Sequence, residues 1–184
     1  PNSDTLVVTS FDDSGTLGNV VDNGDGTFDY DPNGAFEGLA VGETATDTFT
    51  YTISDGNGGS DTATATITIT GANDAPTAVD DTVATDPDLA FGEDDGSRDI
   101  TADLLGNDSD PDGSDVLSIT AVDDTGTLGS VTLVGGAVSY DPNGAFEALA
   151  VGETATDTFT YTIREGNGGS DTASSEEHKS ELHS

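Results

Sequence analysis

The chain has 184 residues, of which 37 are acidic and 3 are basic, so its formal net charge at pH 7 is -34. This charge excludes nucleic acid as a natural partner, because phosphate binding needs a basic footprint, and it disfavours an anionic membrane surface. Leu, Ile, Val and Phe make up about a fifth of the residues, a composition close to that of disordered chains. We therefore expect bound cations to help the chain fold.

Cysteine usage and hydropathy narrow the chemistry further. The chain has no Cys, which excludes disulfides and thiolate zinc sites. No apolar run approaches the ~20 residues of a membrane span, so we expect no direct membrane insertion. Pro1 is not an initiator residue, so we expect any targeting signal to lie outside this sequence.

Apolar and polar residues alternate along the chain, which indicates short, half-buried strands. In DTFTYTI, Phe49, Tyr51 and Ile53 share one face and threonines occupy the other. Turn-forming clusters such as DPNG and DGNGG separate these stretches, and no segment has a convincing helical period. In the second half we expect strands at 77–85, 98–103, 116–122, 129–134, 136–140 and 157–163. The pattern predicts an all-β protein of seven-stranded antiparallel sandwiches with immunoglobulin-like architecture.

One long stretch of the chain occurs twice. YDPNGAFEGLAVGETATDTFTYTI at 30–53 returns at 140–163 with a single change, Gly38 to Ala148. The chain therefore holds two tandem copies of one repeat, and the first copy lacks its opening ~35 residues. We expect a partial repeat at 1–72, a linker at 73–76 and a second repeat at 77–173.

The end of the second copy departs from the repeat. Residues 61–70 of the first copy read DTATATITIT, whereas the second copy ends in TASSEEHKSELHS, which has no apolar alternation. This ending also carries both histidines, His178 and His183. We expect residues 174–184 to be a non-native or disordered tail, and the second copy to lack its last strand.

An acidic loop carries the strongest chemical signal. Four aspartates lie within eight residues, at Asp108, Asp110, Asp112 and Asp115. The pattern D-x-D-x-D-G presents three carboxylates on a tight turn, which suits calcium, a hard cation that takes six to eight oxygen ligands. The loop is not an EF-hand, because Ile119 stands where that loop needs Glu and strands flank it. The alternative interpretation is a hydrated Asx-rich turn without an ion.

The topology of a sandwich predicts that other acidic groups join this loop. The loop, the turn before the last strand and the incoming linker should lie at the same end of the second copy. We expect a metal site formed by Asp108, Asp110, Asp112, Asp115, Glu165, Asn73 and Asp74, with Glu37 and Glu43 of the first copy pointing toward the same seam. Two like charges 4 Å apart repel by about 4 kcal/mol at an effective dielectric near 20, and one divalent ion reverses that penalty. Magnesium fits less well, because it keeps several waters.

Three stretches resemble a known family: SDPDGSDVLSITAV, GAVSYDPNGAFEALAVGETATDTFTYTI and SDGNGGSDTATATITITGANDAPTA. They are similar to the cadherin-like repeats, grouped with VCBS and RapA-type repeats, of large secreted bacterial adhesins of the RTX type. The resemblance covers nearly the whole chain except 174–184. It implies that Asn73, Asp74, Asp110 and Asp112 bind calcium at a domain junction, and that Asp55 is the equivalent ligand in the first copy. The sequence departs from the pattern at Arg164 and Glu165, where the first copy has Ser54 and Asp55.

These observations together predict a non-enzymatic, calcium-stiffened arm segment of an extracellular bacterial adhesin that serves cell adhesion or biofilm formation. Its direct partners would be neighbouring repeats, and a surface polysaccharide or host ligand would be the target of the whole adhesin. Two alternatives stay open, a calcium-dependent carbohydrate-binding module that uses Phe146 and an accessory spacer domain of a secreted hydrolase. Catalysis finds little support, because both histidines lie in the tail and water-exposed aspartates offer no carboxyl of raised pKa in a cleft. Tyrosines that alternate with core positions are expected to be buried, at Tyr30, Tyr51, Tyr140 and Tyr161.

Overall fold

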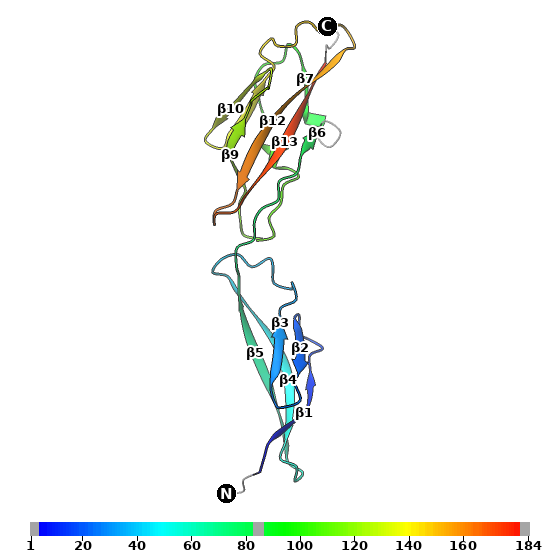
Figure 1. Cartoon of the computed structure of the whole chain (residues 1–184), viewed down its shortest axis with the longest axis vertical. Helices are drawn as coiled ribbons and strands as arrows, with labels where there is room; N and C mark the ends of the chain where they lie inside the picture. Colours follow the sequence, from blue (N-terminus) through cyan, green and yellow to red (C-terminus); the bar gives the residue numbers. More distant parts are fainter. Residues whose placement is uncertain (1–3, 83–86, 181–184) are drawn as a thin grey trace. The chain divides into compact units, whose positions relative to one another are not determined.

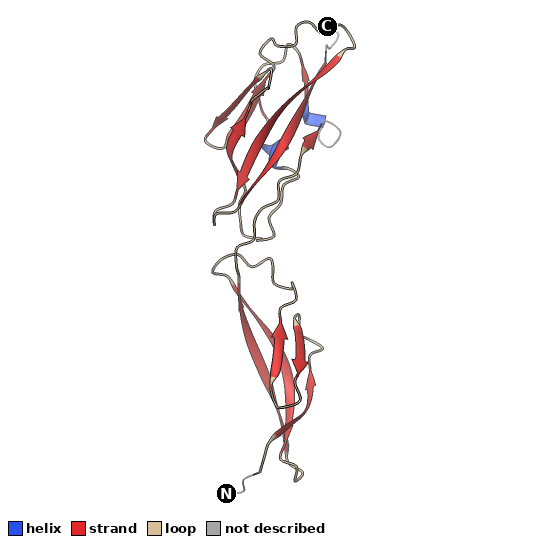
Figure 2. Ribbon diagram, viewed as in Figure 1, coloured by secondary structure: helices blue, strands red, loops and turns tan. Residues whose placement is uncertain are grey.

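The computed structural model describes residues 4–82 and 87–180. The chain folds as two compact units, Pro1–Asn73 and Asp74–Ser184, and the division falls within the expected linker. Strands form most of the regular structure in each unit (Figure 2). The expected all-β class is confirmed. The end of the strand expected at 77–85, the last residues of the tail and His183 lie outside the described residues.

The first unit contains a three-stranded sheet and a two-stranded hairpin (Figure 1). The sheet has the order β1 (Val7–Asp12), β4 (Thr44–Ser54) and β5 (Ser60–Thr70), and the hairpin consists of β2 (Asn19–Asp22) and β3 (Phe28–Asp31). The ring centroid of Phe28 lies 4.9 Å from that of Phe49 on β4 and 5.5 Å from that of Phe11 on β1. These aromatic contacts join the hairpin to the sheet.

The second unit repeats this framework and adds several short elements before it. The added elements are β6 (Asp81–Thr82), the 3-10 helix η1 (Pro87–Leu89), β7 (Ala90–Gly92), β8 (Arg98–Asp99) and helix α1 (Thr101–Leu105). The framework consists of β9 (Ser118–Asp123), β10 (Ser130–Val134), β11 (Ala137–Asp141), β12 (Thr154–Arg164) and β13 (Ser170–Ser180). One sheet has the order β6-β13-β12-β9, with β7 also parallel to β13, and the other has the order β10-β11-β8.

The core of the second unit lies between these sheets. Tyr140, Tyr161 and Ile163 are fully buried in it together with Ile100 and Leu104. The interpretation of Tyr140 and Tyr161 as core residues is therefore confirmed. In the first unit, the equivalent Tyr51 is only partly buried.

The sequence prediction of a strand at 98–103 is wrong over most of its length. Only Arg98–Asp99 forms a strand, and α1 begins at Thr101. The Asp99 carboxylate accepts hydrogen bonds from the Thr101 amide at 2.9 Å and the Thr101 hydroxyl at 2.6 Å, which turns the chain at this point. Ile100 and Leu104 are four residues apart, so one helical turn directs both into the core.

The expectation that the second copy lacks its last strand is also wrong. Strand β13 pairs antiparallel with β12 along its whole length, from Thr154 opposite Ser180 to Arg164 opposite Ser170. The equivalent strands β4 and β5 pair in the same way. Backbone hydrogen bonds hold a ladder whatever the side chains are, so the GNGGS turn and an intact β12 suffice to align this segment. That its sequence is non-native to the repeat stays a prediction.

The inward face of β13 is unusually polar for a core. Ser175, Glu177 and Lys179 are fully buried at positions where β5 has Ala65, Ile67 and Ile69. The Lys179 ammonium lies 4.0 Å from the ring centroid of Tyr140 and 4.6 Å from that of Phe91.

Burial perturbs both charged groups on this face. Glu177 Oε2 and Lys179 Nζ are buried without a hydrogen-bond partner. Burial raises the pKa of the Glu177 carboxyl and lowers the pKa of the Lys179 ammonium, because each charged form loses its hydration. Forming this strand therefore costs free energy, because Glu177 and Lys179 lose their contact with water.

Each unit is organised around one buried aspartate. In the second unit, Asp157 accepts hydrogen bonds from the Leu128 amide at 2.9 Å, the Gly129 amide at 2.8 Å and the Tyr140 hydroxyl at 2.8 Å. A side chain at Gly129 would overlap the Tyr140 hydroxyl, so only glycine fits there. These bonds tie β12 to the opposite layer.

The same network occurs in the first unit. Asp47 accepts from the Leu17 amide at 2.9 Å, the Gly18 amide at 2.9 Å and the Tyr30 hydroxyl at 2.8 Å. The repeat thus preserves a buried carboxylate, its glycine neighbour and its tyrosine donor as one structural unit.

The Asp157 network predicts a specific loss of stability. Asp157→Asn replaces this hydrogen-bonded carboxylate by an amide whose NH2 group faces donors, and we expect it to lower the free energy of unfolding by about 1–3 kcal/mol. Tyr140→Phe removes one bond and should cost less. Chemical denaturation of both variants measures this. The exposed change Asp124→Asn serves as the charge-matched control and should stay within about 0.5 kcal/mol of wild type; an equal loss in Asp124→Asn would show that charge, and not the network, matters.

Candidate metal centre

The acidic loop is attached to the first residues of the second unit by backbone hydrogen bonds. The Thr77 amide donates to the Ser109 carbonyl at 2.8 Å, and the Ser109 amide donates back to the Thr77 carbonyl at 3.1 Å. The loop and the incoming chain therefore lie side by side within this unit.

Three of the predicted carboxylates come together in this loop. Asp110, Asp112 and Asp115 each offer an oxygen, and these oxygens all lie within 4.8 Å of one another. Asp112 is 1% exposed, while Asp110 and Asp115 are partly buried. The clustering predicted for these three aspartates is present in the structure.

Local hydrogen bonds fix the cluster in shape. The Asp112 amide donates to Asp110 Oδ1 at 2.9 Å, and the Asp115 amide donates to the Asp112 carbonyl at 3.0 Å. The Asp74 amide, from the incoming chain, donates to Asp112 Oδ2 at 2.9 Å. Short-range Asx turns thus set the loop, and one longer-range bond connects it to the linker.

Two carboxylate oxygens of the cluster lack hydrogen-bond partners. Asp110 Oδ2 and Asp112 Oδ1 are buried without one. A buried anionic oxygen without a donor is costly, whereas a hard cation needs such oxygens as ligands. The donor set consists of carboxylate oxygens, without sulfur or imidazole, and it fits calcium better than zinc. This arrangement can therefore hold a divalent cation.

The turn between β12 and β13 adds two polar residues beside the cluster. Asn167 Nδ2 donates to both carboxylate oxygens of Asp115, at 3.1 and 3.0 Å. The buried carboxylate of Glu165 accepts hydrogen bonds from the backbone amides of Asn167 and Gly169. A side chain at Gly169 would lie 2.8 Å from Pro76 Cδ, so this turn touches the incoming chain.

Asp108 is not part of the cluster formed by Asp110, Asp112 and Asp115. Its Oδ1 accepts from the Val79 amide at 2.8 Å, and its carboxylate lies 3.4 Å from the Tyr161 hydroxyl. Partial burial raises the pKa of Asp108, and the hydrogen bonds from Val79 and Tyr161 offset part of this effect. Asp108 therefore connects the incoming chain, at Val79, to the core residue Tyr161.

The remaining predicted ligands belong to the first unit. Asp55 accepts from the Asn57 and Gly59 amides, both at 2.8 Å, and these bonds lower its pKa. Glu43 is exposed and accepts from the Ala40 amide at 3.2 Å, and Glu37 and Asn73 are exposed. Their participation in a site with the second unit stays a prediction.

Sequence reasoning missed two residues, one that contacts the acidic loop and one that holds the incoming chain. One is Asn167, which contacts Asp115, and the other is Asp171, whose Oδ2 accepts from the Ala78 amide at 2.9 Å. Both lie in the GNGGSD stretch, which also occurs in the first copy. That repetition is the available signal, although the residue types by themselves predict only a turn.

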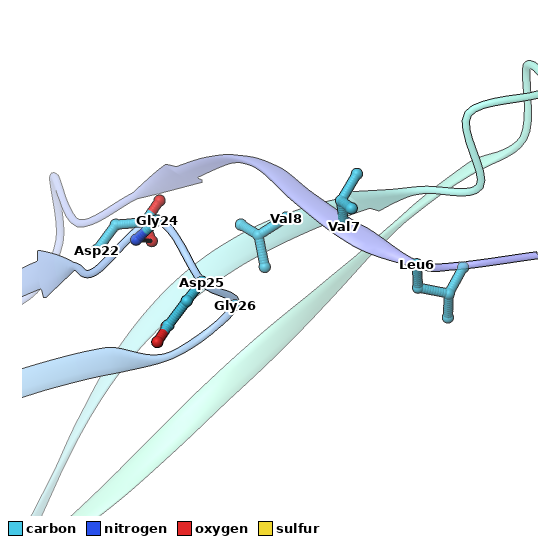
Figure 3. A pocket seen from close by; sticks show the side chains of 7 residues that line it. All are labelled: Leu6, Val7, Val8, Asp22, Gly24, Asp25 and Gly26. Atoms are coloured by element: carbon cyan, nitrogen blue, oxygen red, sulfur yellow. Dashed lines mark hydrogen bonds between the residues drawn. The ribbon is translucent and has the colours of Figure 1, made fainter.

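Two other features bear on ligand binding. A hollow of about 180 Å3 in the first unit lies between β1 and the β2–β3 turn, and Figure 3 labels the residues that line it. The carboxylates of Asp22 and Asp25 accept hydrogen bonds from the Gly24 amide at 2.8 Å and the Thr27 amide at 3.0 Å, so they brace that turn.

Phe146, the residue of the carbohydrate alternative, is 5% exposed and so presents little ring surface to a sugar.

Comparison with solved structures finds several similar chains. The human mucin-like protocadherin EC1-2 structure matches with a TM-score of 0.54 and 12% identity, covering 97% of this chain and 84% of that one. The mouse clustered PcdhgC3 EC1-3 structure matches with a TM-score of 0.39 and 16% identity over 96% of this chain and 56% of that one. The protocadherin GammaB4 extracellular domain has a TM-score of 0.41 and 14% identity over 95% of this chain, which spans 27% of its length. No curated protein matches the chain.

The fold is that of cadherin repeats, the class to which the human structure belongs. The family model for the bacterial cadherin-like domain matches residues 1–71 and 73–176, and the chain belongs to this family. The resemblance seen in the sequence is thereby confirmed. Cadherin-like domains are non-enzymatic, extracellular adhesion-type repeats. In the described part of the chain, every helix is too short to span a bilayer.

The perturbed Asp108 carboxyl predicts a pH effect. The pKa of Asp108 is raised in the folded state, so this carboxyl holds its proton more strongly in the native protein than in the unfolded chain. The contribution of Asp108 to the free energy of unfolding therefore falls as the pH rises above 3.8, the ordinary pKa of the group. Asp108→Asn should remove this contribution. We expect the difference in unfolding free energy between variant and wild type, measured in chelator from acid to neutral pH, to shift in favour of the variant as pH rises. A difference independent of pH would contradict this.

Proposed function

We propose that this chain is a calcium-stiffened structural segment of an extracellular bacterial adhesin, which serves cell adhesion or biofilm formation as part of an extended arm. The observation that carries the proposal is the pair of buried, partnerless oxygens on Asp110 and Asp112, beside the linker amide of Asp74. A hard cation would supply these oxygens with the positive charge that no hydrogen-bond donor supplies.

Electrostatics supports a divalent ion at this position. Three carboxylates within 4.8 Å repel one another strongly when unneutralised. The few basic residues of the chain are Arg98, Arg164 and Lys179. Lys179 lies in the core among aromatic rings, away from the surface loops. A divalent cation bound by these aspartates would neutralise the loop.

The position of the cluster supports a mechanical role. Asp112 binds the Asp74 amide, Asp108 binds the Val79 amide and Asp171 binds the Ala78 amide, so the incoming chain is held at several points. A cation bound by Asp110 and Asp112 would stiffen the loop against which this chain lies. Asn73, Asp74, Glu37, Glu43 and Glu165 are proposed to complete the site, and Asp55 is proposed to serve the preceding junction.

Calcium fits the extracellular setting of the proposal. Calcium is abundant outside cells and scarce in the cytosol, so the site would load after export. Binding to the folded state alone stabilises it by about 2.7 kcal/mol at a hundred times the dissociation constant. The unloaded chain would stay less stable and easier to export.

The first test is a calcium titration of thermal stability. We expect calcium to raise the Tm of the second unit by about 10 °C near saturation, and matched magnesium to raise it much less. Asp110→Ala with Asp112→Ala should abolish most of this response. The control is Asp13→Ala with Asp124→Ala, which removes the same charge from two exposed sites and should keep the response. Equal responses to calcium and magnesium would indicate general charge screening and would rule the site out.

The second test addresses the arm itself. Small-angle X-ray scattering should give a longer and stiffer particle with calcium than with chelator, and the Asp110→Ala, Asp112→Ala variant should resemble the chelated wild type under both conditions. Calcium binding without any change in the scattering profile would leave the metal site standing and would refute the arm.

A further inference from the structure

Two charged side chains of β13 are buried in the core of the second unit. Glu177 and Lys179 are both 0% exposed. The matching positions of β5, which pairs with β4 in the same register as β13 pairs with β12, are Ile67 and Ile69. A carboxyl and an ammonium group therefore occupy places that the framework of the first unit fills with aliphatic side chains.

The Glu177 carboxyl has little to replace its lost hydration. Its Oε1 accepts a hydrogen bond from the Ser175 hydroxyl at 2.9 Å, and its Oε2 is buried without a hydrogen-bond partner among the described residues. The charged groups that act on it are Lys179 on the same strand, Arg98 of β8 and Asp103 of α1. Burial raises the pKa of the carboxyl from 4.5 to about 7, and the two cations offset only part of this effect.

The Lys179 ammonium lies in a cage of aromatic rings. Its Nζ is 4.0 Å from the ring centroid of Tyr140, 4.6 Å from that of Phe91 and 5.8 Å from that of Phe146. Within the described part of the chain, this Nζ has no hydrogen-bond partner. The faces of aromatic rings attract a cation, yet they do not supply the hydrogen bonds that an ammonium makes in water. The charged form of Lys179 is therefore held at a cost in free energy.

The neighbouring charges compensate this cost only in part. Burial lowers the pKa of the Lys179 ammonium from 10.5 to about 8, although Glu177 and Asp157 of β12 favour the charged form. Arg98 opposes the charged form as well. Burial also raises the pKa of the Tyr140 hydroxyl above its usual value of 10, so this ring stays neutral below that pH. Burial therefore opposes the charge of both Glu177 and Lys179.

The short strand β7 closes this site and runs beside β13 (Figure 1). It has three residues, and each pairs with one residue of β13, Phe91 with Lys179. Phe91 is 2% exposed, and its ring centroid lies 5.0 Å from that of Tyr140 and 4.0 Å from Cζ of Arg98. Phe91 therefore contributes to the cage that excludes water from Lys179. A three-residue strand can detach locally at a smaller cost than the unfolding of the whole unit.

We propose that Glu177 and Lys179 make the contact between β7 and β13 a pH-sensitive latch. The latch detaches most often when both groups are charged, because detachment lets water reach the carboxylate and the ammonium. It detaches less often when either group is neutral, since one of the two buried charges is then absent. The latch goes beyond the calcium proposal and does not depend on it, because it involves none of the aspartates of the acidic loop.

The pH at which the latch is weakest follows from the two groups. Glu177 holds its proton more strongly when the latch is closed, so its contribution to closing is full below pH 4.5 and is lost as the pH rises through about 7. Lys179 holds its proton less strongly when the latch is closed, so closing becomes more favourable as the pH rises from about 8 toward 10.5. The latch is therefore weakest between about pH 7 and about pH 8, and both acid and alkali tighten it.

Hydrogen–deuterium exchange of the β7 amides measures the latch directly. The full chain is followed in chelator at constant ionic strength from about pH 5 to about pH 9, and the rates are corrected for the pH dependence of intrinsic exchange. We expect the equilibrium constant for opening β7 to be about tenfold larger near neutral pH than at either end, since one pKa unit corresponds to a tenfold change. A profile without this minimum in the protection of β7 would refute the latch.

Low concentrations of urea distinguish local detachment from unfolding of the whole unit. Local opening exposes little surface, so exchange of the β7 amides should hardly change with urea below the unfolding transition, whereas exchange in β12 should rise steeply. Equal urea dependence in β7 and β12 would show that β7 exchanges only when the whole unit unfolds, which contradicts the latch.

Two substitutions assign the acid and alkaline limbs of the profile. Glu177→Gln should remove the acid limb and keep the alkaline one, and Lys179→Met should do the reverse. Each replaces a buried charge by a neutral side chain of similar size, so loss of folding does not explain the expected effects. An unchanged profile in either variant would overturn the proposal.

Two further variants serve as controls. Glu147→Gln removes the same charge as Glu177→Gln from an exposed site of the second unit and should leave the profile unchanged. His178→Gln removes a titratable group from the opposite face of β13, where its Nδ1 lies 3.9 Å from Glu176, and should also leave the profile unchanged. A minimum that disappears in either control would assign the pH response to surface charge or to His178 and would rule the latch out.

Discussion

The backbone ladder between β12 and β13 is the constraint on which the second unit depends. Its eleven paired positions align a strand whose inward side chains do not suit a core. The same ladder carries, at one end, the turn with Glu165 and Asn167 that borders the acidic loop. The core, the linker contacts and the candidate metal centre are thus built on one hairpin, and the turn that joins its strands fixes their register.

Local chemistry made much of this site predictable from sequence. The D-x-D-x-D-G pattern forms Asx turns through bonds such as that from the Asp112 amide to Asp110, which need no distant partner. The placement of Asp108 against Tyr161 and Val79 depends on residues far away in the chain, so the pattern could not separate it from its neighbours. Asn167 was missed for the same reason, because its partner Asp115 lies on another loop.

The errors in the fold have a common physical origin. The lack of apolar alternation in β13 predicts no strand there, yet strand pairing is made by the backbone and follows the partner strand. Residues 98–103 were expected to be extended, but the turn at Asp99 and the burial of Ile100 and Leu104 favour one helical turn. In both cases tertiary context decided between conformations that the local sequence leaves close in energy.

The distribution of basic residues has a consequence for the environments in which such repeats work. Residues 1–73 contain no Lys or Arg, so the first unit holds its many carboxylates without an internal basic counter-charge. Proteins that rely on surface ion pairs lose that contribution as ionic strength rises. This unit has no such pairs with Lys or Arg to lose, and dissolved salt only relieves its self-repulsion. Brine and seawater should therefore suit a string of these domains better than fresh water.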